Sequence, residues 1–258
     1  MRESYCDDAP MDAQQVGPGV HRVESHGVIN WYVVEDAGRL TAIDAGLPPD
    51  WETFKRVARS LGRVPGDLDA VVLTHAHVDH TGFAEQARVE AGATVYLPSG
   101  DRELAKHPLR GMNPERSPAS YLLRYSATRS LYATIARAGG LRPRDIEEFE
   151  TYSDGDTLDA VPGKPVAVGT PGHTHGHTAL MLGDILFTGD ALVTRDPYTG
   201  RTGPRLVALA ATTDAAQALA SIDRIAATGA GTLLPGHGEP WTSGAEEAAR
   251  LAREAGAA

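Results

Sequence analysis

Val71-Val72-Leu73-Thr74-His75-Ala76-His77-Val78-Asp79-His80 is a short apolar run that ends in four side chains able to bind a metal ion. The length of the run is typical of a buried strand, and open α/β sheets place their chemistry at the ends of such strands. In extended backbone, residues i and i+2 point to one face, so His75 and His77 can bind one ion together. Asp79 and His80 follow the strand and are better placed for a second ion.

Three later stretches repeat this plan of a short strand, a turn with glycine and a side chain that can bind a metal. They are Thr170-Pro171-Gly172-His173, Phe187-Thr188-Gly189-Asp190 and Leu233-Leu234-Pro235-Gly236-His237. Four strand ends therefore carry such groups, and we expect them to meet at one place.

With the early acidic residue of Ala42-Ile43-Asp44-Ala45-Gly46, these ordered motifs resemble the metallo-β-lactamase fold superfamily over residues 20–240. The resemblance implies an α/β fold, a four-layer αββα sandwich with a dinuclear metal site at one edge. It also implies a first metal site, a second site and a carboxylate that bridges them. The first would be His75, His77 and His173, the second Asp79, His80 and His237, and the bridge Asp190.

The chemistry of these side chains favours a catalytic centre over a structural one. Imidazole and carboxylate ligands without thiolate suit Zn²⁺ best here, with Fe, Mn, Co or Ni as alternatives. Shared over two divalent ions, the set leaves coordination positions for water and substrate. Two metals can activate a water and polarise a carbonyl, so no Ser or Cys nucleophile is required. We predict catalytic roles for Asp79 and Asp190.

Two further residues are predicted to support the ligands. Asp44 can accept the second N–H of a ligand histidine and so fix its tautomer, although an ordinary turn aspartate before Gly46 is the alternative. His177 matches the second histidine of the family's PGHTxGH pattern, which predicts a supporting or substrate-facing role. His175 is expected to be exposed.

Composition is typical of one globular domain over residues 1–258. The chain is 41% hydrophobic and 22% charged, contains one cysteine and has a formal charge of −10. It shows neither a signal peptide nor a membrane-length apolar run, so we expect a cytoplasmic protein without a membrane partner. The negative charge disfavours nucleic acid as a partner. A homodimer is compatible with the sequence. Helices are expected over residues 51–61, 83–90, 213–227 and 245–254.

Residues 99–150 lie outside the shared motifs and are predicted to form a helical cap. Ser117 and Pro118 start a helix that Gly139-Gly140 ends. Its tyrosines share a helical face and, together with Tyr198, are candidate substrate contacts: Tyr121, Tyr125 and Tyr132. Residues 99–145 hold nine Lys and Arg against four Asp and Glu. This excess indicates either a solvated surface or attraction of an anionic or acyl-bearing substrate.

Within the superfamily, the chain looks most like the glyoxalase II-like and lactonase-like hydrolases, which implies hydrolysis of a thioester or lactone in a small molecule. Asp190 stands where the best-known zinc β-lactamases have a cysteine ligand, which disfavours β-lactams. Val193 stands where quorum-quenching lactonases have tyrosine, and Tyr198 is the nearby substitute. The alternatives are a persulfide dioxygenase with one Fe(II) on His75, His173 and Asp190, a phosphodiesterase or nuclease, and a non-catalytic metal-binding protein.

Overall fold

Strand β3 (Ile29–Asp36) shows how the sequence builds the layers, because alternate side chains point to opposite faces of a strand. Trp31 and Val33 belong to an apolar cluster on one side, whereas Tyr32 and Val34 belong to a second cluster on the other. Both faces are buried, which explains the continuous apolar run. The computed structural model describes residues 13–107 and 113–256.

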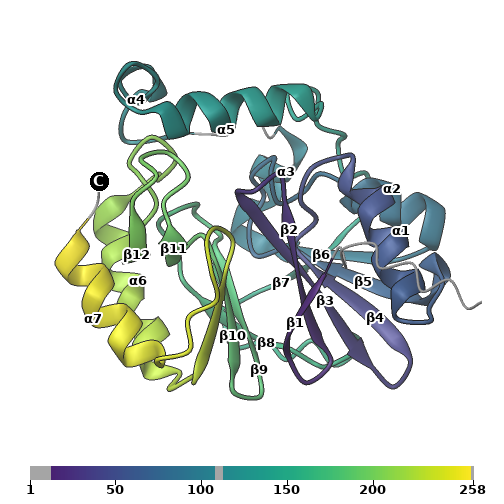
Figure 1. Ribbon diagram of the computed structural model, residues 1–258. Helices are drawn as coiled ribbons and strands as arrows, with labels where there is room; N and C mark the ends of the chain where they lie inside the picture. Colours follow the sequence, from purple (N-terminus) through teal and green to yellow (C-terminus); the bar gives the residue numbers. More distant parts are fainter. Residues whose placement is uncertain (1–12, 108–112, 257–258) are drawn as a thin grey trace, which may run out of the picture.

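A seven-stranded sheet contains β3 and forms the first half of the molecule (Figure 1). Strands β1 to β4 pair antiparallel, and β4 to β7 pair parallel. The other strands are β1 (Gln14–Gly17), β2 (Val20–Ser25), β4 (Arg39–Ile43), β5 (Leu68–Val72), β6 (Thr94–Pro98) and β7 (Glu150–Tyr152).

A four-stranded sheet with the order β13-β10-β9-β8 forms the second half, and a two-stranded ribbon of β11 and β12 lies beside it. Within the four-stranded sheet, β8, β10 and β13 all run in one direction, because β9 is antiparallel to β8 and β10. The strands are β8 (Val166–Gly169), β9 (Thr178–Leu182), β10 (Ile185–Gly189), β11 (Val193–Arg195), β12 (Thr202–Arg205) and β13 (Thr232–Pro235).

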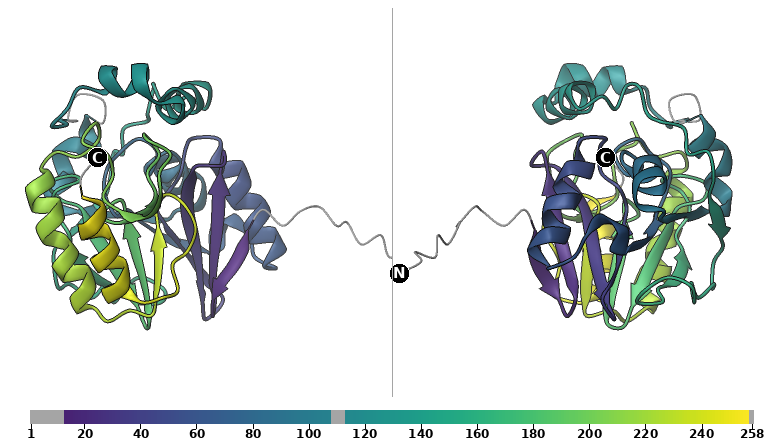
Figure 2. Two further views of the ribbon diagram at one scale, coloured as in Figure 1. Left: turned by 60° about the vertical axis from the view of Figure 1, so that its left-hand side comes forward. Right: turned by 90° about the vertical axis from the view of Figure 1, so that its right-hand side faces the viewer.

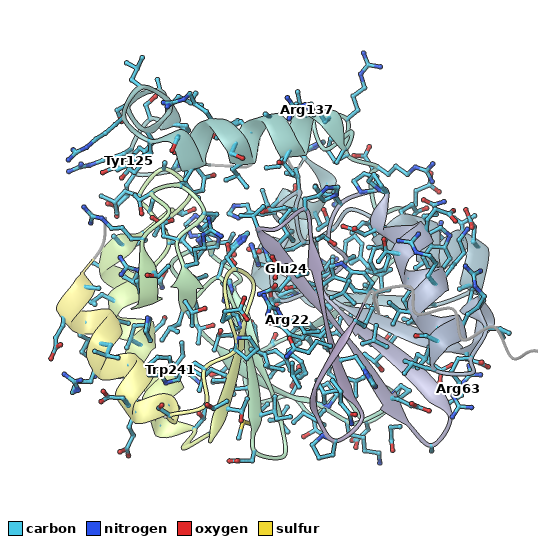
Figure 3. The ribbon with its side chains drawn as sticks, in the orientation of Figure 1. Arg22, Glu24, Arg63, Tyr125, Arg137 and Trp241 are labelled. Atoms are coloured by element: carbon cyan, nitrogen blue, oxygen red, sulfur yellow. The ribbon has the colours of Figure 1, made fainter. Side chains whose placement is uncertain are left out.

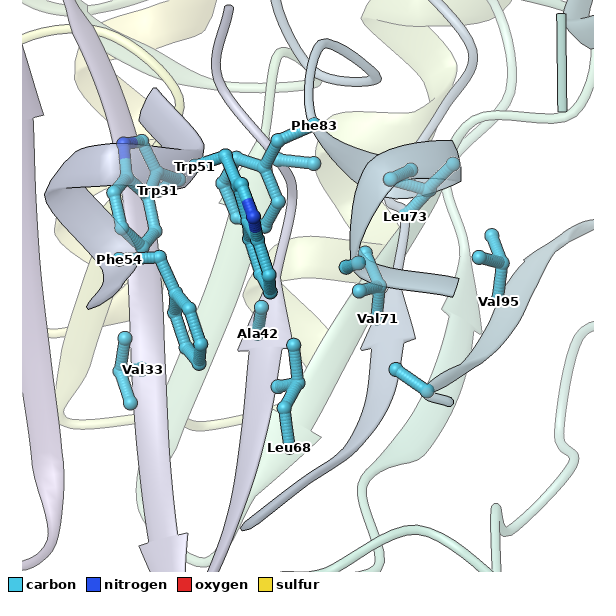
Figure 4. Close-up of a cluster of buried hydrophobic side chains, with 14 of the residues drawn as sticks. Trp31, Val33, Ala42, Trp51, Phe54, Leu68, Val71, Leu73, Phe83 and Val95 are labelled. Carbon is cyan, nitrogen blue, oxygen red and sulfur yellow. The ribbon is translucent and has the colours of Figure 1, made fainter. Parts of the chain in front are cut away.

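Helices cover the outer face of each sheet. On the first sheet lie α1 (Asp50–Ser60) and α2 (Ala84–Ala91), and Trp51 and Phe54 of α1 stack at 5.2 Å between ring centroids (Figure 4). On the second lie α6 (Ala215–Ala227) and α7 (Ala245–Ala255), whose apolar residues form one cluster with β10 and β13. The αββα sandwich expected from the sequence is confirmed.

Residues 99–150 contain the short helices η2 (Ser99–Asp101) and α3 (Arg102–Lys106), then α4 (Pro118–Arg124) and α5 (Ser126–Arg137). The prediction of one helix between Ser117 and Gly139 is wrong. Tyr125 has extended backbone and separates α4 from α5. The interruption leaves the carbonyl of Leu122 free, and the Arg129 guanidinium donates a hydrogen bond to it at 2.8 Å. The Arg129 side chain thus replaces the backbone N–H that would donate to this carbonyl in a continuous helix. Helix propensity alone does not predict such a replacement.

Helices α4 and α5 lie across one end of the sandwich in every view (Figures 1 and 2). Tyr121 and Leu131 on these helices pack with Val193 and Val207 of the β11–β12 region in a separate apolar cluster. The remaining short helix, η1 (Pro65–Asp67), precedes β5. Over the part of the chain that the structure describes, no helix has the length and apolar character needed to span a bilayer.

Candidate metal centre

The strand directions bring the predicted ligands to one edge of the sandwich. His75, His77, Asp79 and His80 follow β5, which is parallel to β4, whose end carries Asp44. On the facing sheet, the ligands follow three strands of common direction: His173 after β8, Asp190 after β10 and His237 after β13. Because parallel strands end at the same edge, seven side chains far apart in sequence become neighbours.

Two groups at this edge, and a third that links them through His75, His80 and Asp190, have metal-binding geometry. The candidate ligand atoms of His75, His77 and His173 all lie within 4.8 Å of one another, and so do those of Asp79, His80 and His237. In the first group, Nε2 of His173 lies 2.9 Å from Nδ1 of His77. In the second, Nε2 of His237 lies 3.6 Å from Oδ2 of Asp79.

Asp190 lies between the two groups. Its Oδ2 is 3.4 Å from Nε2 of His173 and 3.3 Å from Nε2 of His237, and its Oδ1 is 3.5 Å from Nε2 of His80. Gly236 makes room for this carboxylate, because a Cβ at that position would lie 2.4 Å from Oδ1 of Asp190. One carboxylate therefore faces histidines of both groups, the arrangement that a bridging ligand requires.

Asp44 orients two of the histidines. Its Oδ2 lies 2.8 Å from Nδ1 of His80, and its carboxylate accepts hydrogen bonds from the amide and hydroxyl of Thr74. Thr74 Oγ1 lies 3.0 Å from Nδ1 of His75. Because the Thr74 hydroxyl donates its own proton to Asp44, its oxygen can accept a hydrogen bond from Nδ1–H of His75. Both imidazoles then present Nε2, and not Nδ1, to a metal.

His177 does not present a free nitrogen to the centre. Its Nε2 accepts the backbone N–H of Asp190 at 3.0 Å, and its Nδ1 lies 2.9 Å from the hydroxyl of Thr170. Burial lowers the pKa of His177 to about 3, so its imidazole is neutral and can accept from Asp190 at neutral pH. The residue holds the backbone that carries the candidate bridge. His175 is exposed.

The loop that carries His237 is fixed by the first sheet. Asn30 of β3 donates from Nδ2 to the carbonyls of Pro235 and Gly238, at 2.9 and 2.6 Å. Arg22 of β2 donates to Oδ1 of Asn30 at 3.0 Å and is 4% exposed (Figure 3). Nδ1 of His237 lies 2.5 Å from the carbonyl of Val28, which leaves its Nε2 for the centre. Sequence analysis did not identify these contacts, because they cross between the sheets.

Asp101 is a buried carboxylate that the sequence motifs did not indicate. It accepts the amide of Ala76, the hydroxyl of Thr174 and the amide of Gly176, at 3.0, 2.7 and 2.7 Å. Ala76 separates His75 from His77, and Thr174 follows His173. One side chain therefore joins the two loops that supply the first group. The only signal in the sequence was its position just beyond the end of β6.

The donor atoms fit a divalent metal. Among the described residues, four buried polar atoms have no hydrogen-bond partner: Nε2 of His75, Nε2 of His80, Nδ1 of His173 and Oδ1 of Asp190. A buried polar atom without a partner is costly, typically about 1–3 kcal/mol. Metal ligation would satisfy the atoms that face the centre, and the nitrogen and oxygen donors suit Zn²⁺ and its neighbours.

The electrostatics of the two groups differ. Burial lowers the pKa of His75 and of His173 well below that of an exposed histidine, so both are neutral and ready to ligate. Burial acts in the same direction on His80, but the carboxylates of Asp44 and Asp190 outweigh it and raise the pKa of His80 to about 10. Despite its burial, Asp190 has a pKa held well below the usual range by His237 and His80. A metal must therefore displace a proton from the second group.

Two of the four candidate substrate tyrosines lie near this centre. Burial raises the pKa of Tyr132 and of Tyr198, and the Asp79 carboxylate raises both further. Thr128 of α5 donates to the carbonyl of Tyr198 at 2.7 Å and fixes the loop to the cap. Tyr121 and Tyr125 pack against each other, with ring centroids 5.7 Å apart.

Sequence comparison identifies relatives of this chain among known proteins. A protein of Mycobacterium tuberculosis described as uncharacterized is 30% identical over 186 residues, 69% of this chain and 72% of that protein. A probable polyketide biosynthesis zinc-dependent hydrolase of Bacillus velezensis is 26% identical over 179 residues, 68% of this chain and 61% of that protein.

Solved structures show the same fold. A metallo-beta-lactamase family protein from Thermus thermophilus superimposes with a TM-score of 0.67 at 22% identity, over 93% of this chain and 80% of that one. The metallo-beta-lactamase superfamily profile matches residues 25–237, which span every candidate ligand. The chain therefore belongs to the metallo-beta-lactamase superfamily, and its His and Asp clusters are suited to a divalent metal.

Proposed function

We propose that this protein hydrolyses an ester-like bond, a thioester or a lactone, in an acyl substrate, with two divalent ions held by the two groups at the sheet edge. The observation that carries the proposal is the position of Asp190 between two complete three-residue groups. A single-iron persulfide dioxygenase needs only His75, His173 and Asp190 and leaves the second group without a role.

The metals would be held by His75, His77 and His173 on one side and by Asp79, His80 and His237 on the other, with Asp190 shared. Bound there, two Zn²⁺ ions would supply an activated water and polarise the scissile carbonyl. The candidate ligand side chains surround the position of the reacting atoms. Buried neighbours fix these ligands: Asp44 orients His80, and His177 accepts the backbone N–H of Asp190.

Asp79 is suited to move the proton. Its side chain is 14% exposed, whereas those of His80, Asp190 and His237 are 5% exposed or less. Attack of water forms a carbon–oxygen bond and breaks the bond to sulfur or to the ring oxygen. Asp79 accepts the water's proton and passes it to the departing sulfur or ring oxygen, so the leaving group departs as a neutral thiol or alcohol.

The phenols of Tyr132 and Tyr198 are suited to bind the carbonyl or the leaving group. Their raised pKa values keep them protonated at neutral pH, and the two phenols hydrogen-bond to each other, so the pair can direct an O–H to the substrate. They come from the cap and from the β11–β12 loop, outside the segments that carry the ligands. Substrate preference would then depend on the cap and the chemistry on the sheet edge.

Metal content is the first test. Elemental analysis of protein produced with excess Zn²⁺ should approach two ions per chain, and the Asp190→Ala variant should bind fewer and lose most activity, because two cations then face each other without the shared carboxylate. A persistent value of one ion with full activity would exclude the dinuclear proposal.

Substrate class is the second test. The metal-loaded protein should hydrolyse short acyl thioesters or lactones faster than a β-lactam and a phosphodiester of similar size. Oxygen uptake with glutathione persulfide serves as the control for dioxygenase chemistry. Turnover of the persulfide with oxygen consumption, or preference for the phosphodiester, would reject the proposed function.

A further inference from the structure

One part of the cap, residues 116–144, carries charge of one sign. Residues 116–144 contain six arginines and no Asp or Glu. The rest of the chain has 18 Lys and Arg against all 34 Asp and Glu, a formal charge of −16. The arginines are Arg116, Arg124, Arg129, Arg137, Arg142 and Arg144. A solvated helix usually mixes both signs, so this segregation is unusual for a surface that faces only water.

The charges of these arginines are not balanced within the cap: Arg129 donates to the carbonyl of Leu122 and Arg124 lies over the Tyr125 ring, contacts that bring no carboxylate. All six are exposed, and none forms an ion pair with the residues that the structure describes. By contrast, Arg39, Arg88 and Arg250 elsewhere on the surface each contact a carboxylate. Leu123 lies on the same cap and is 88% exposed. The cap therefore presents guanidinium groups with an uncovered apolar side chain among them.

The charged cap adjoins the candidate metal centre. The Tyr132 ring of α5 lies 6.3 Å from the Tyr198 ring, centroid to centroid, and Leu131 of α5 packs in one cluster with Val193, which follows Asp190 closely in the chain. Tyr125 and Arg137 mark the two ends of α5 in Figure 3. At 1.5 Å per residue, the 12 residues of α5 span about 18 Å, so a single phosphate or carboxylate cannot contact the whole set.

We propose that α4, α5 and residues 138–144 dock an acidic protein that carries the acyl substrate as a thioester to the metal centre. This inference rests on the proposed function and specifies the form of its substrate. The width of the positive surface requires an extended partner, and arginine pairs with carboxylates through two parallel hydrogen bonds. Only Leu123 and Leu141 are exposed large apolar residues on the described cap, too few for insertion into a lipid surface. The acidic remainder of the chain disfavours nucleic acid.

The test compares one acyl group on two thiols. A hexanoyl thioester is placed on free pantetheine and on the pantetheine arm of an acidic acyl-carrier protein. We expect kcat/KM to be at least about tenfold higher for the protein-bound thioester at low salt, and the advantage to shrink at about 0.5 M salt, where charges are screened. The Arg116→Glu/Arg137→Glu/Arg142→Glu variant should lose this advantage and keep the rate with hexanoyl-pantetheine.

Arg59→Glu is a control for charge reversal away from the cap, because Arg59 is exposed in the last turn of α1 and belongs to the body of the protein. It should leave both rates unchanged. A direct measurement by fluorescence anisotropy uses the carrier with a non-hydrolysable thioether in place of the thioester. Weaker binding by the triple variant alone supports the docking surface even if neither thioester is cleaved, an outcome that would reject only the proposed function.

Other outcomes overturn the docking proposal. Equal kcat/KM values for both thioesters, or equal carrier binding by the wild type and the triple variant, would do so. Salt-sensitive binding to phosphatidylglycerol vesicles without carrier binding would assign the surface to a membrane. Salt-sensitive self-association that the triple variant loses, again without carrier binding, would assign it to a second copy of the chain.

Discussion

Oδ2 of Asp44 lies 2.8 Å from Nδ1 of His80, although 36 residues separate them in the sequence. Asp44 has a backbone φ of 60°, a left-handed conformation that is uncommon outside glycine. Its carboxylate also accepts the amide of Thr74 at 2.7 Å. An aspartate in this uncommon conformation, whose carboxylate makes several hydrogen bonds, indicates that the carboxylate is required at this position.

Replacement of Asp44 by alanine should weaken metal binding while the fold persists. His80 loses the acceptor that fixes its tautomer, and comparable changes around metal sites lower affinity by about 10–100-fold. Competition with a chromophoric chelator measures this affinity. Asp50→Asn is the control, because Asp50 is also buried but accepts from Ser25 and Leu47 and contacts none of the candidate ligands. Equal losses in both variants would indicate a general defect in packing.

Metal binding should release at least one proton at pH 7. In the metal-free protein the pKa of His80 is raised to about 10, so its imidazole is protonated, whereas a metal requires the neutral form. We expect Zn²⁺ affinity to increase between about pH 7 and 10, by up to roughly tenfold per pH unit. Calorimetry in two buffers of different ionisation enthalpy counts the protons. Binding without proton release would contradict the high pKa of His80.

The same protonation affects the stability of the metal-free protein. An exposed histidine has a pKa of 6.5, and in the folded chain the value is raised, so the folded state binds the proton more tightly. The resulting stabilisation is fully present below about pH 6.5 and is lost as the pH rises through 10. Thermal unfolding of metal-free protein at pH 6 and 10 should show this decrease, and the Asp44→Ala variant should show a smaller one.

Asp101 should act as a positioning residue for the first metal group. The Asp101→Ala change removes all three hydrogen bonds that join the loops of His75 and His173, whereas Thr174→Val removes one. We expect a graded loss of affinity at the first group, largest for alanine and about 10–100-fold. Absorption spectra of protein loaded with Co²⁺ in place of Zn²⁺ distinguish metal bound at the first group from metal bound at the second.

Asp154→Asn provides the control for Asp101. Asp154 lies near the same sheet edge and accepts the amide of Gly169 at 2.8 Å, but it does not contact the ligand loops. It should lower thermal stability slightly without a change in the cobalt spectrum. If Asp101→Ala lowers the melting temperature of the metal-free and metal-loaded proteins equally and leaves both affinities intact, its role is structural only.

The sequence was sufficient to predict the fold and the gathering of the seven ligand-type residues, because each follows a short apolar strand and a turn. It did not predict the hydrogen bonds between the two sheets that position the ligand loops, such as the one that Asn30 donates to the carbonyl of Pro235. Those contacts depend on how two sheets face each other, which local periodicity does not contain. The break at Tyr125 was missed for a related reason, since the Arg129 side chain replaces a helical hydrogen bond there.

Removal of single phenol hydroxyls should separate a catalytic contact from packing. Tyr198 is 7% exposed and lies under the cap, and its pKa is raised by burial and by Tyr132 and Asp79 nearby. If its hydroxyl donates to the substrate in the transition state, Tyr198→Phe should lower kcat by about tenfold or more with little change in KM. Tyr132→Phe should also lower kcat with little change in KM, and the factor should differ between thioester and lactone substrates.

Tyr125→Phe is the matched control for these two variants, because Tyr125 packs on Tyr121 and under Arg124, whose guanidinium carbon is 5.3 Å from its ring centroid. It should leave kcat and substrate preference unchanged. Metal content should be equal in all three variants, because the candidate ligands come from other segments. Should Tyr132→Phe and Tyr198→Phe change only the melting temperature, these rings fill the apolar cluster under α5, and substrate preference must come from residues outside the cap.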